Sequence, residues 1–227
     1  MKVTALIVAG GMGKRMREGK NKVFLPLSGK TVIEHTLKAF LQAGSVGEIV
    51  IVTRREDIPE CERLFLNVKK TVKIVVGGST RQESVYNGLK EIDDGIVLIH
   101  DAARALIDVE TVEQCVEGCV KYGAAAVGVA CVDTLKKVDE KGFITETVPR
   151  EGIYRIQTPQ TFRVRDIKCA HEKALEEGFE TTDDCALYEK YMGKIKIIEG
   201  INKNIKITFP EDLVLARAIL KRNKEIK

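Results

Sequence analysis

The chain has 227 residues, of which 44% are apolar and 31% are charged, with a formal net charge of +4. This is enough for one large domain or two small ones, and no apolar run approaches the roughly 18 residues that span a bilayer. The N-terminus does not resemble a secretion signal, and Lys and Glu are interleaved rather than gathered into the basic stripe of a nucleic-acid binder. We therefore expect a cytoplasmic protein that binds neither nucleic acid nor a membrane.

The first predicted strand, residues 2–9, leads directly into a glycine-rich loop. Glycines let the backbone approach a ligand closely, and their N–H groups together with cations can surround phosphate oxygens. The hydroxyl of a Walker A loop and the third glycine of a dinucleotide fingerprint are both missing. The loop therefore predicts phosphate binding of another kind, the alternative being a tight turn that binds nothing. Its glycines and cations are Gly10, Gly11, Gly13, Lys14 and Arg15.

Strands and helices alternate as far as residue 130. Buried strands are predicted at residues 48–53, 73–76, 96–99 and 124–130, and helices after a capping box at 31–34, at about 58–68, after 79–83 and at about 109–121. This alternation predicts a Rossmann-like, doubly wound α/β fold with a mostly parallel sheet. Such sheets bind ligands beyond the carboxyl ends of their strands. Three polar or glycine-rich clusters are expected to meet there, at residues 10–15, 77–84 and 101–104.

The alternation ends after Cys131. Residues 134–139 and 143–147 alternate with period two around a turn, which predicts a β-hairpin. We expect it to protrude as an arm over about residues 132–157 and to make the protein a homodimer, because pairing with a second subunit would cover its edges. The alternative is a hairpin that folds onto its own domain. No linker or repeat is evident, so residues 1–227 are predicted to form a single domain with this arm.

The C-terminal part is predicted to return to the sheet. Residues 157–160 form a polar segment with a rigid corner, and a helix at about 166–177 is expected to carry His171 on its surface. Residues 181–184 cap a further helix. Strands are predicted at 194–198 and 204–208, and the terminal helix is expected to begin at Pro210.

The six cysteines indicate reduced thiols rather than a cysteine-based site. No pair has the Cys-x-x-Cys spacing of a zinc or redox motif. Without such spacing, cysteines in this setting usually serve as small buried residues. We expect this role for Cys61, Cys115, Cys119, Cys131, Cys169 and Cys185.

Cations predominate near the predicted strand ends. Neither a Ser-His-Asp order nor a set of His and carboxylates with metal-ligand spacing is evident. A site built from cations and glycine amides is typical of phosphoryl or nucleotidyl transfer, which needs positioning and charge neutralisation more than a protein nucleophile. The cations are Arg15, Lys22, Arg104 and Lys206, with Arg150 at the foot of the arm, and the prominent acids are Asp101 and Asp183.

Four motifs also carry a family resemblance. Residues 9–16 (AGGMGKRM) with Lys22 look like the signature loop of nucleotide-dependent pyrophosphorylases. Taken with residues 100–104 (HDAAR), 158–160 (TPQ) and 204–208 (NIKIT), the chain resembles the 2-C-methyl-D-erythritol 4-phosphate cytidylyltransferases of the non-mevalonate isoprenoid pathway. The family often has Ala-Ala-Gly where this chain has AGG at 9–11, and proline where it has Ala105. Neither difference removes a functional group.

The resemblance implies that the phosphate of methylerythritol phosphate attacks the α-phosphorus of CTP and that pyrophosphate leaves. It implies that Arg15 and Lys22 stabilise the transition state, that Lys206 holds the attacking phosphate, and that Arg150 reaches in from the partner subunit. It also implies Mg²⁺ bound mainly through the triphosphate, with no protein metal site. The implied nucleotide contacts are Ala9, Gly10, Gly11, Gly13, Gly78, Ser79 and Ser84, and the implied substrate contacts are Asp101, Arg104, Thr134, Thr158 and Thr181.

Two other functions remain open at this point. One is a cytidylyltransferase that acts on a pentitol phosphate such as ribitol 5-phosphate, although the Ala-Ala-Arg sequence at 102–104 argues mildly against it. The other is a nucleotide sensor without catalysis. The combination of Arg15, Lys22 and Lys206 argues against a sensor, because these cations suit charge development in a transition state.

Overall fold

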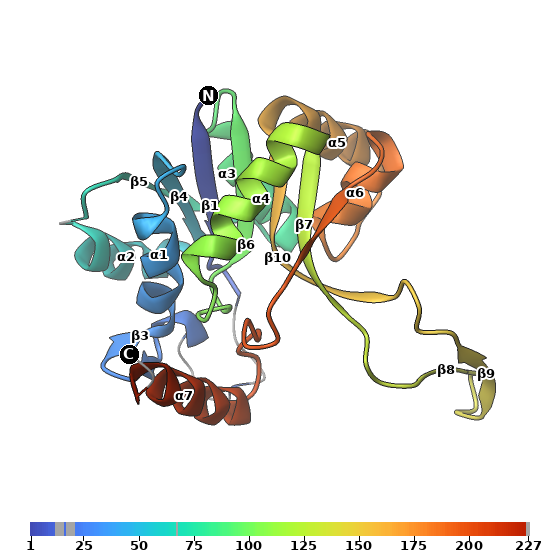
Figure 1. The fold of residues 1–227 in the computed structure, drawn as a ribbon. Helices are drawn as coiled ribbons and strands as arrows, with labels where there is room; N and C mark the ends of the chain where they lie inside the picture. Colours follow the sequence, from blue (N-terminus) through green and yellow to red (C-terminus); the bar gives the residue numbers. More distant parts are fainter. Residues whose placement is uncertain (12–15, 17–20, 67, 226–227) are drawn as a thin grey trace.

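The computed structural model describes residues 1–11, 16, 21–66 and 68–225, which form a central sheet flanked by helices (Figure 1). The strand order is β11-β7-β10-β6-β1-β4-β5, and β10 runs antiparallel to its neighbours while the other pairings are parallel. The predicted α/β fold with a mostly parallel sheet is therefore confirmed. The strands are β1 (Val3–Val8), β4 (Glu48–Thr53), β5 (Thr71–Val76), β6 (Ile96–Asp101), β7 (Ala124–Ala130), β10 (Tyr154–Arg163) and β11 (Lys196–Glu199).

Helices cover both faces of the sheet because successive strand residues point to opposite sides. Ile7 and Ile51 belong to one apolar cluster with α1 and α4, whereas Leu6 and Val50 belong to a second cluster with α3, α5 and α6. A strand buried on both faces reads as a continuous apolar run. The helices are α1 (Val32–Gln42), α2 (Ile58–Phe65), α3 (Arg81–Lys90), α4 (Val109–Tyr122), α5 (Val164–Glu177), α6 (Asp184–Tyr191) and α7 (Pro210–Glu225). None of the described helices is long and apolar enough to cross a membrane.

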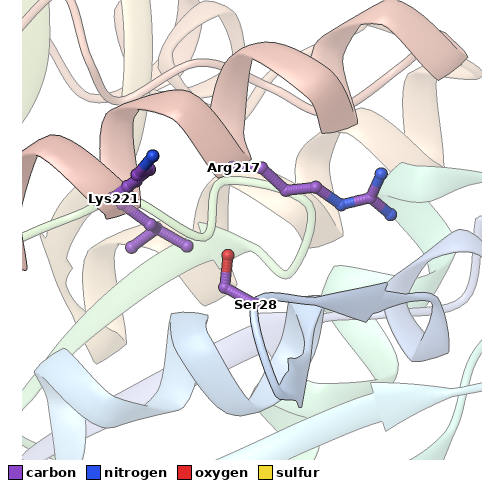
Figure 2. A pocket seen from close by; sticks show the side chains of 4 residues that line it. Ser28, Arg217 and Lys221 are labelled. Atoms are coloured by element: carbon purple, nitrogen blue, oxygen red, sulfur yellow. The ribbon is translucent and has the colours of Figure 1, made fainter.

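A third apolar cluster joins α7 to the segments that follow the strand ends. It includes Met16 of the first loop, Leu27 of the short hairpin β2 (Pro26–Leu27) and β3 (Lys30–Thr31), and Ile207 near the last helix. Between this hairpin and α7 lies a cavity of about 420 Å³, where Figure 2 shows Ser28 on one side and Arg217 and Lys221 on the other. None of the predicted site residues is among the described residues that line this cavity.

The predicted hairpin is present as β8 (Leu135–Val138) and β9 (Ile144–Val148), paired antiparallel. Figure 1 shows it at the end of two extended segments, well away from the sheet. Its apolar side chains at Val138, Phe143 and Ile144 are exposed in the single chain. The protrusion is therefore confirmed, and the alternative of a hairpin folded onto its own domain is wrong.

Several boundaries and environments differ from the prediction. Residues 204–208 form no strand, because Ile207 turns into the third apolar cluster and its N–H group bonds the Ala103 carbonyl at 2.8 Å instead of a neighbouring strand. His171 is buried rather than on the surface, since Tyr86 of α3 and Asp184 of α6 cover it. Residues 157–160 lie buried in β10, and the predicted corner coincides with a shift of register between Ile156 and Gln160. Of the six cysteines, all of them free, Cys169 is only partly buried.

Gly95, in the turn before β6, offers a test of this fold. Its φ is +103°, and a Cβ there would collide with the backbone oxygen of Lys2. We expect Gly95→Ala to lower the free energy of unfolding by about 3 kcal/mol, because backbone strain and a clash each cost on the order of 1–3 kcal/mol. Urea unfolding measures the change.

Gly178 is the matched control, because its φ is +64° but a Cβ there would have open space around it. Gly178→Ala should cost only about 1 kcal/mol, the usual penalty for a left-handed alanine. Equal losses in the two variants would contradict the close approach of Gly95 to β1.

Candidate functional site

Backbone hydrogen bonds bring the three predicted clusters together at the carboxyl ends of the strands. Adjacent parallel strands end at the same edge, so the loops that follow them lie side by side. The start of the first loop, the 77–84 loop and the 101–104 turn are each tied to a neighbouring strand end. The bonds, N–H to carbonyl, are Ala9 to Val52 at 2.7 Å, Gly77 to Thr53 at 2.8 Å and Ala102 to Val8 at 3.0 Å.

The 77–84 loop is held closely against the start of α3. The Ser84 hydroxyl accepts the Gly78 N–H at 3.0 Å and donates to the Thr80 carbonyl at 2.8 Å. The Glu83 carboxylate accepts both the N–H and the hydroxyl of Ser79, each at 2.7 Å. A Cβ at Gly78 would collide with the Glu83 side chain, so glycine is required for this packing. The loop therefore presents a fixed backbone surface next to the first glycine loop.

Asp101, the last residue of β6, is the acidic centre of the site. Its side chain is 11% exposed and lies 2.7 Å from Lys206 Nζ and 3.4 Å from Arg81 Nε. Burial by itself would raise the pKa of this carboxyl, but Arg81, Lys206 and Arg104 outweigh burial and hold the pKa well below its usual range. Asp101 is therefore ionised at neutral pH and keeps cations from separate segments in place.

A buried hydrogen-bond chain fixes the backbone beside Asp101. His100 Nε2 lies 3.2 Å from the Arg104 carbonyl, which can only accept, so Nε2 carries the proton. Nδ1 is then the acceptor for the Thr158 hydroxyl at 3.0 Å, and that hydroxyl accepts the Asp101 N–H at 3.2 Å. Burial lowers the pKa of His100 to about 4, so the ring stays neutral and this arrangement persists at neutral pH.

Asn204 anchors the irregular segment that carries Lys206. Its side-chain amide donates to Gln157 Oε1 at 3.1 Å and to the Thr158 carbonyl at 3.0 Å, and its own carbonyl accepts Arg104 Nη1 at 2.8 Å. The segment is thus tied to β10 and to the 101–104 turn by side chains rather than by strand pairing. This places Lys206 beside Asp101.

The structure gathers most of the predicted site residues. Asp101, Arg104, Thr158 and Lys206 form one bonded group, and Gly78, Ser79 and Ser84 form a second group, connected to it by Arg81. The Thr181 N–H reaches the same region by donating to Gln82 Oε1 at 3.0 Å.

Ala9 with Gly10 and Gly11 starts the first loop, and Lys22 follows it. The Asn21 side chain, directly before Lys22, donates to the Ala9 carbonyl at 2.7 Å. Lys22 therefore lies next to the start of the loop. Gly13 and Arg15 fall outside the described residues.

Two predicted residues lie away from this group, on the arm. Arg150 donates from Nη1 to the Val132 carbonyl at 2.5 Å, and Thr134 is exposed one residue before β8. Within the described part of one chain, neither Arg150 nor Thr134 contacts Asp101 or Lys206. Their predicted roles require the arm of another subunit.

Sequence reasoning missed three residues that hold the site residues from the protein interior: Arg81, Asp184 and Asn204. Arg81 Nη1 lies 2.8 Å from Asp184 Oδ2, and Asp184 is almost fully buried. The signal for Arg81 was available, because it is the first residue of the helix after the glycine-rich end of β5. Nothing in the local sequence pairs it with an acid 103 residues away.

No group of three or more His, Cys, Asp or Glu side chains suited to a metal ion occurs among the described residues. Asp101 is the central carboxylate, and both of its oxygens face cations. This donor set fits a divalent ion only if the ligand's own phosphate oxygens supply most of the coordination.

Comparisons with known proteins agree along nearly the whole chain. A sequence model of the 2-C-methyl-D-erythritol 4-phosphate cytidylyltransferase family matches residues 3–222. The protein of that name from Caldanaerobacter subterraneus subsp. tengcongensis is 45% identical, over 98% of this chain and 100% of the relative. The one from Geotalea uraniireducens is 44% identical, over 97% of each chain.

Solved structures give the same result. The crystal structure of 4-diphosphocytidyl-2C-methyl-D-erythritol synthase from Anaerococcus prevotii has a TM-score of 0.87 at 31% identity, covering 97% of this chain and 98% of that one. The 2-C-methyl-D-erythritol 4-phosphate cytidylyltransferase from Thermus thermophilus has a TM-score of 0.79 at 29% identity, covering 95% and 98%.

A doubly wound sheet with glycine-rich loops and cations at its strand ends is typical of proteins that bind phosphates, and the family match shows that this one is an enzyme of the nucleotidyltransferase class. The family match extends from β1 into α7 and includes each of the segments that form the site. This chain belongs to the 2-C-methyl-D-erythritol 4-phosphate cytidylyltransferase family.

The Thr158 hydroxyl provides a test of the site geometry. Thr158→Val keeps the side-chain shape but leaves the Asp101 N–H and His100 Nδ1 without partners. We expect the free energy of unfolding to fall by roughly 2–4 kcal/mol, since each buried unsatisfied group costs about 1–3 kcal/mol. Urea unfolding of the pure protein measures it.

Thr4→Val in β1 is the control, because the Thr4 hydroxyl is buried without a hydrogen-bond partner. This variant should be as stable as the original chain or slightly more stable. A Thr158→Val protein that unfolds at the same urea concentration as Thr4→Val would refute the hydrogen-bond chain.

Proposed function

We propose that this chain transfers the cytidylyl group of CTP to 2-C-methyl-D-erythritol 4-phosphate and releases pyrophosphate. A phosphate oxygen of the alcohol phosphate forms a bond to the α-phosphorus, and the bond from that phosphorus to the leaving pyrophosphate breaks. The observation that carries the proposal is the position of Lys206, paired with Asp101 next to the glycine-rich loops of a chain from this family. An exposed ammonium there can meet an incoming phosphate.

The nucleotide side of the proposed site consists of the two glycine-rich loops. Ala9, Gly10 and Gly11, with Gly13, would line the triphosphate and the base, and Gly78, Ser79 and Ser84 would close the other side. The fixed 77–84 backbone supports this role, because a surface held by internal hydrogen bonds needs no reordering when a ligand binds. Arg15 and Lys22 would stabilise the charge that develops on the α-phosphorus oxygens.

The acceptor side consists of the Asp101 group. Lys206 would hold the attacking phosphate, with Thr158 close by, and Asp101 and Arg104 would contact sugar hydroxyls. Burial lowers the pKa of Arg104, yet its guanidinium stays charged. Thr181 and Thr134 are further candidate contacts.

We include Mg²⁺ in the proposal, bound mainly through the triphosphate oxygens. Such an ion supplies neutralisation of the phosphate charge as pyrophosphate leaves. The site's carboxylate-poor donor set supports coordination by the nucleotide rather than by a protein cage.

The arm supports a proposed homodimer. Its apolar side chains at Val138, Phe143 and Ile144 are between 59% and 68% exposed, which is unfavourable unless another surface covers them. A partner's body placed against the arm would cover them and bring Arg150, with Thr134, to the partner's Lys206 side. The active site would then be shared between subunits.

We also propose a cytoplasmic location. All six cysteines are free thiols, and five of them are buried. Burial raises the pKa of Cys61 and Cys115 to about 12, so these thiols are unreactive. This pattern suits a reducing compartment.

Pyrophosphate release measured with each of the four nucleoside triphosphates and each of two alcohol phosphates tests the activity. We expect turnover with CTP and 2-C-methyl-D-erythritol 4-phosphate, and the product should contain one cytidylyl group. Turnover with ribitol 5-phosphate alone would overturn the proposed acceptor. CTP binding without pyrophosphate release under any combination would favour a nucleotide sensor.

A mixture of two inactive variants tests the shared site. Arg150→Ala and Lys206→Ala should each lose most activity, yet a mixed dimer would contain one site with both Lys206 and the partner's Arg150 intact. An equal mixture should recover about a quarter of the original activity, because half of randomly formed dimers are mixed and each has one complete site. Activity is measured after the two variants are unfolded and refolded together.

Each variant refolded alone is the control. Size-exclusion chromatography establishes that dimers have formed in every sample. Dimers that regain no activity in the mixture would show that Arg150 does not act across the interface, and a monomer would contradict the shared site altogether.

A further inference from the structure

Five charged or polar groups from five different segments alternate in a line that runs inward from the site. Lys206 pairs with Asp101 at 2.7 Å, Asp101 with Arg81 at 3.4 Å, Arg81 with Asp184 at 2.8 Å, and Asp184 lies 3.3 Å from His171. Of the two cations, Lys206 is 43% exposed and Arg81 is 24% exposed, and of the two acids, Asp101 is 11% exposed and Asp184 is 1% exposed. The outer cation faces solvent, while the inner one is fixed between two acids.

Asp101 therefore has two cations of unequal freedom. Arg81 is held by Asp184 through one guanidinium nitrogen and reaches Asp101 with another, so its position is fixed from the protein interior. Among the described residues, the Lys206 ammonium forms an ion pair with Asp101 alone. If Lys206 turns to a phosphate, Asp101 still retains a cation.

Leaving a buried carboxylate without a cation is costly, because its charge has been taken out of water. Burial opposes the charged form of Asp101, and Arg81 is the first of the cations that keep its pKa low. Because Arg81 also pairs with Asp101, the carboxylate loses less electrostatic stabilisation when Lys206 moves away. The arrangement thus makes the outer ammonium available to a ligand.

We propose that Arg81 is a positioning residue that holds the Asp101 carboxylate so that Lys206 can be transferred to the phosphate of the acceptor substrate. The inference rests on the proposed function for the identity of that phosphate. Arg81 touches no substrate in this role and acts through Asp101. A lysine could not replace it, because a single ammonium does not present two separate nitrogens to two carboxylates.

Arg81→Met is the test variant, and Asp184→Asn is its matched control. In Arg81→Met, Asp101 keeps Lys206 as its one ion-pair partner among the described residues. The apparent KM for the alcohol phosphate should then rise about tenfold, the effect of one unshared charge pair near a protein surface. In Asp184→Asn, Arg81 still reaches Asp101, so this KM should stay within about twofold of the original.

The double variant Arg81→Met/Asp184→Asn separates positioning from packing. It removes the unpaired buried acid that could unfold the single variant, so thermal stability should recover relative to Arg81→Met. The raised KM for the alcohol phosphate should persist, because Asp101 still lacks its inner cation. A KM that returns to the Asp184→Asn value would assign Arg81 a purely structural role and overturn the proposal.

Acylation of Lys206 by acetic anhydride tests the same inference without any substrate. The extent of modification is measured by mass spectrometry of the peptide that contains Lys206. Lys206 should react several-fold more slowly in Arg81→Met than in the original chain, because an unshared Asp101 holds its ammonium more tightly. Lys38, exposed on α1, should react equally in both proteins.

The two readouts distinguish the possible failures. Slower acylation of Lys206 in a protein that releases no pyrophosphate would sustain the sharing of Asp101 and reject the proposed function. Equal acylation in both proteins would overturn the role of Arg81, whatever the enzyme's activity.

Discussion

The burial of the Asp101 carboxylate is the constraint on which the site depends. A carboxylate at the end of a central strand loses most of its hydration, and it stays ionised only if cations approach it closely. Those cations come from α3 and from the segment before α7, which are remote in sequence. The pairing of Asp101 with these cations therefore fixes how β6, α3 and the segment before α7 lie relative to one another. The glycine-rich loop before α3 is placed by the same contact, because it directly precedes Arg81.

The third apolar cluster includes residues next to Arg104 and Lys206 and therefore supports the segments that carry these two cations. In two places a site residue is followed directly by a residue of this cluster, so that Arg104 precedes Ala105 and Lys206 precedes Ile207. Ala105 and Ile207 are buried in this cluster together with residues of α7, which anchors the backbone that carries Arg104 and Lys206. Ile207 is fully buried and its N–H bonds the Ala103 carbonyl. Packing of α7 against these segments thus helps to fix the positions of Arg104 and Lys206 at the carboxyl ends of the strands.

The sequence predicted the parallel strands because each is a short apolar run between helices with apolar stripes, but it did not predict β10, the antiparallel strand between β6 and β7. It failed where side chains replaced regular pairing: Ile205 and Ile207 alternate like a strand, but Asn204 and the third cluster hold that segment instead. His171 could have been placed correctly, since it lies on the stripe formed by Val164, Ile167, Ala170 and Ala174. The Arg81–Asp184 pair could not, because no local pattern encodes a contact between α3 and α6.

The residues at the site differ in how many bonds hold them in place. Buried residues with several hydrogen bonds form its framework, and exposed residues with a single contact are the ones suited to meet substrate. His100, Thr158 and Asn204 are buried and each makes at least two hydrogen bonds within the protein, so moving one of them breaks several interactions at once. Lys206 has one ion pair at its end, and Arg150 has one hydrogen bond to a carbonyl in the exposed arm. The Arg150 contact is exposed and is worth on the order of 0–1 kcal/mol in water. Asp101 also pairs with Arg81, so an anionic phosphate can take Lys206 without leaving that carboxylate unpaired. The groups proposed to neutralise substrate charge are thus the least firmly held, whereas the residues around them are fixed by several bonds each.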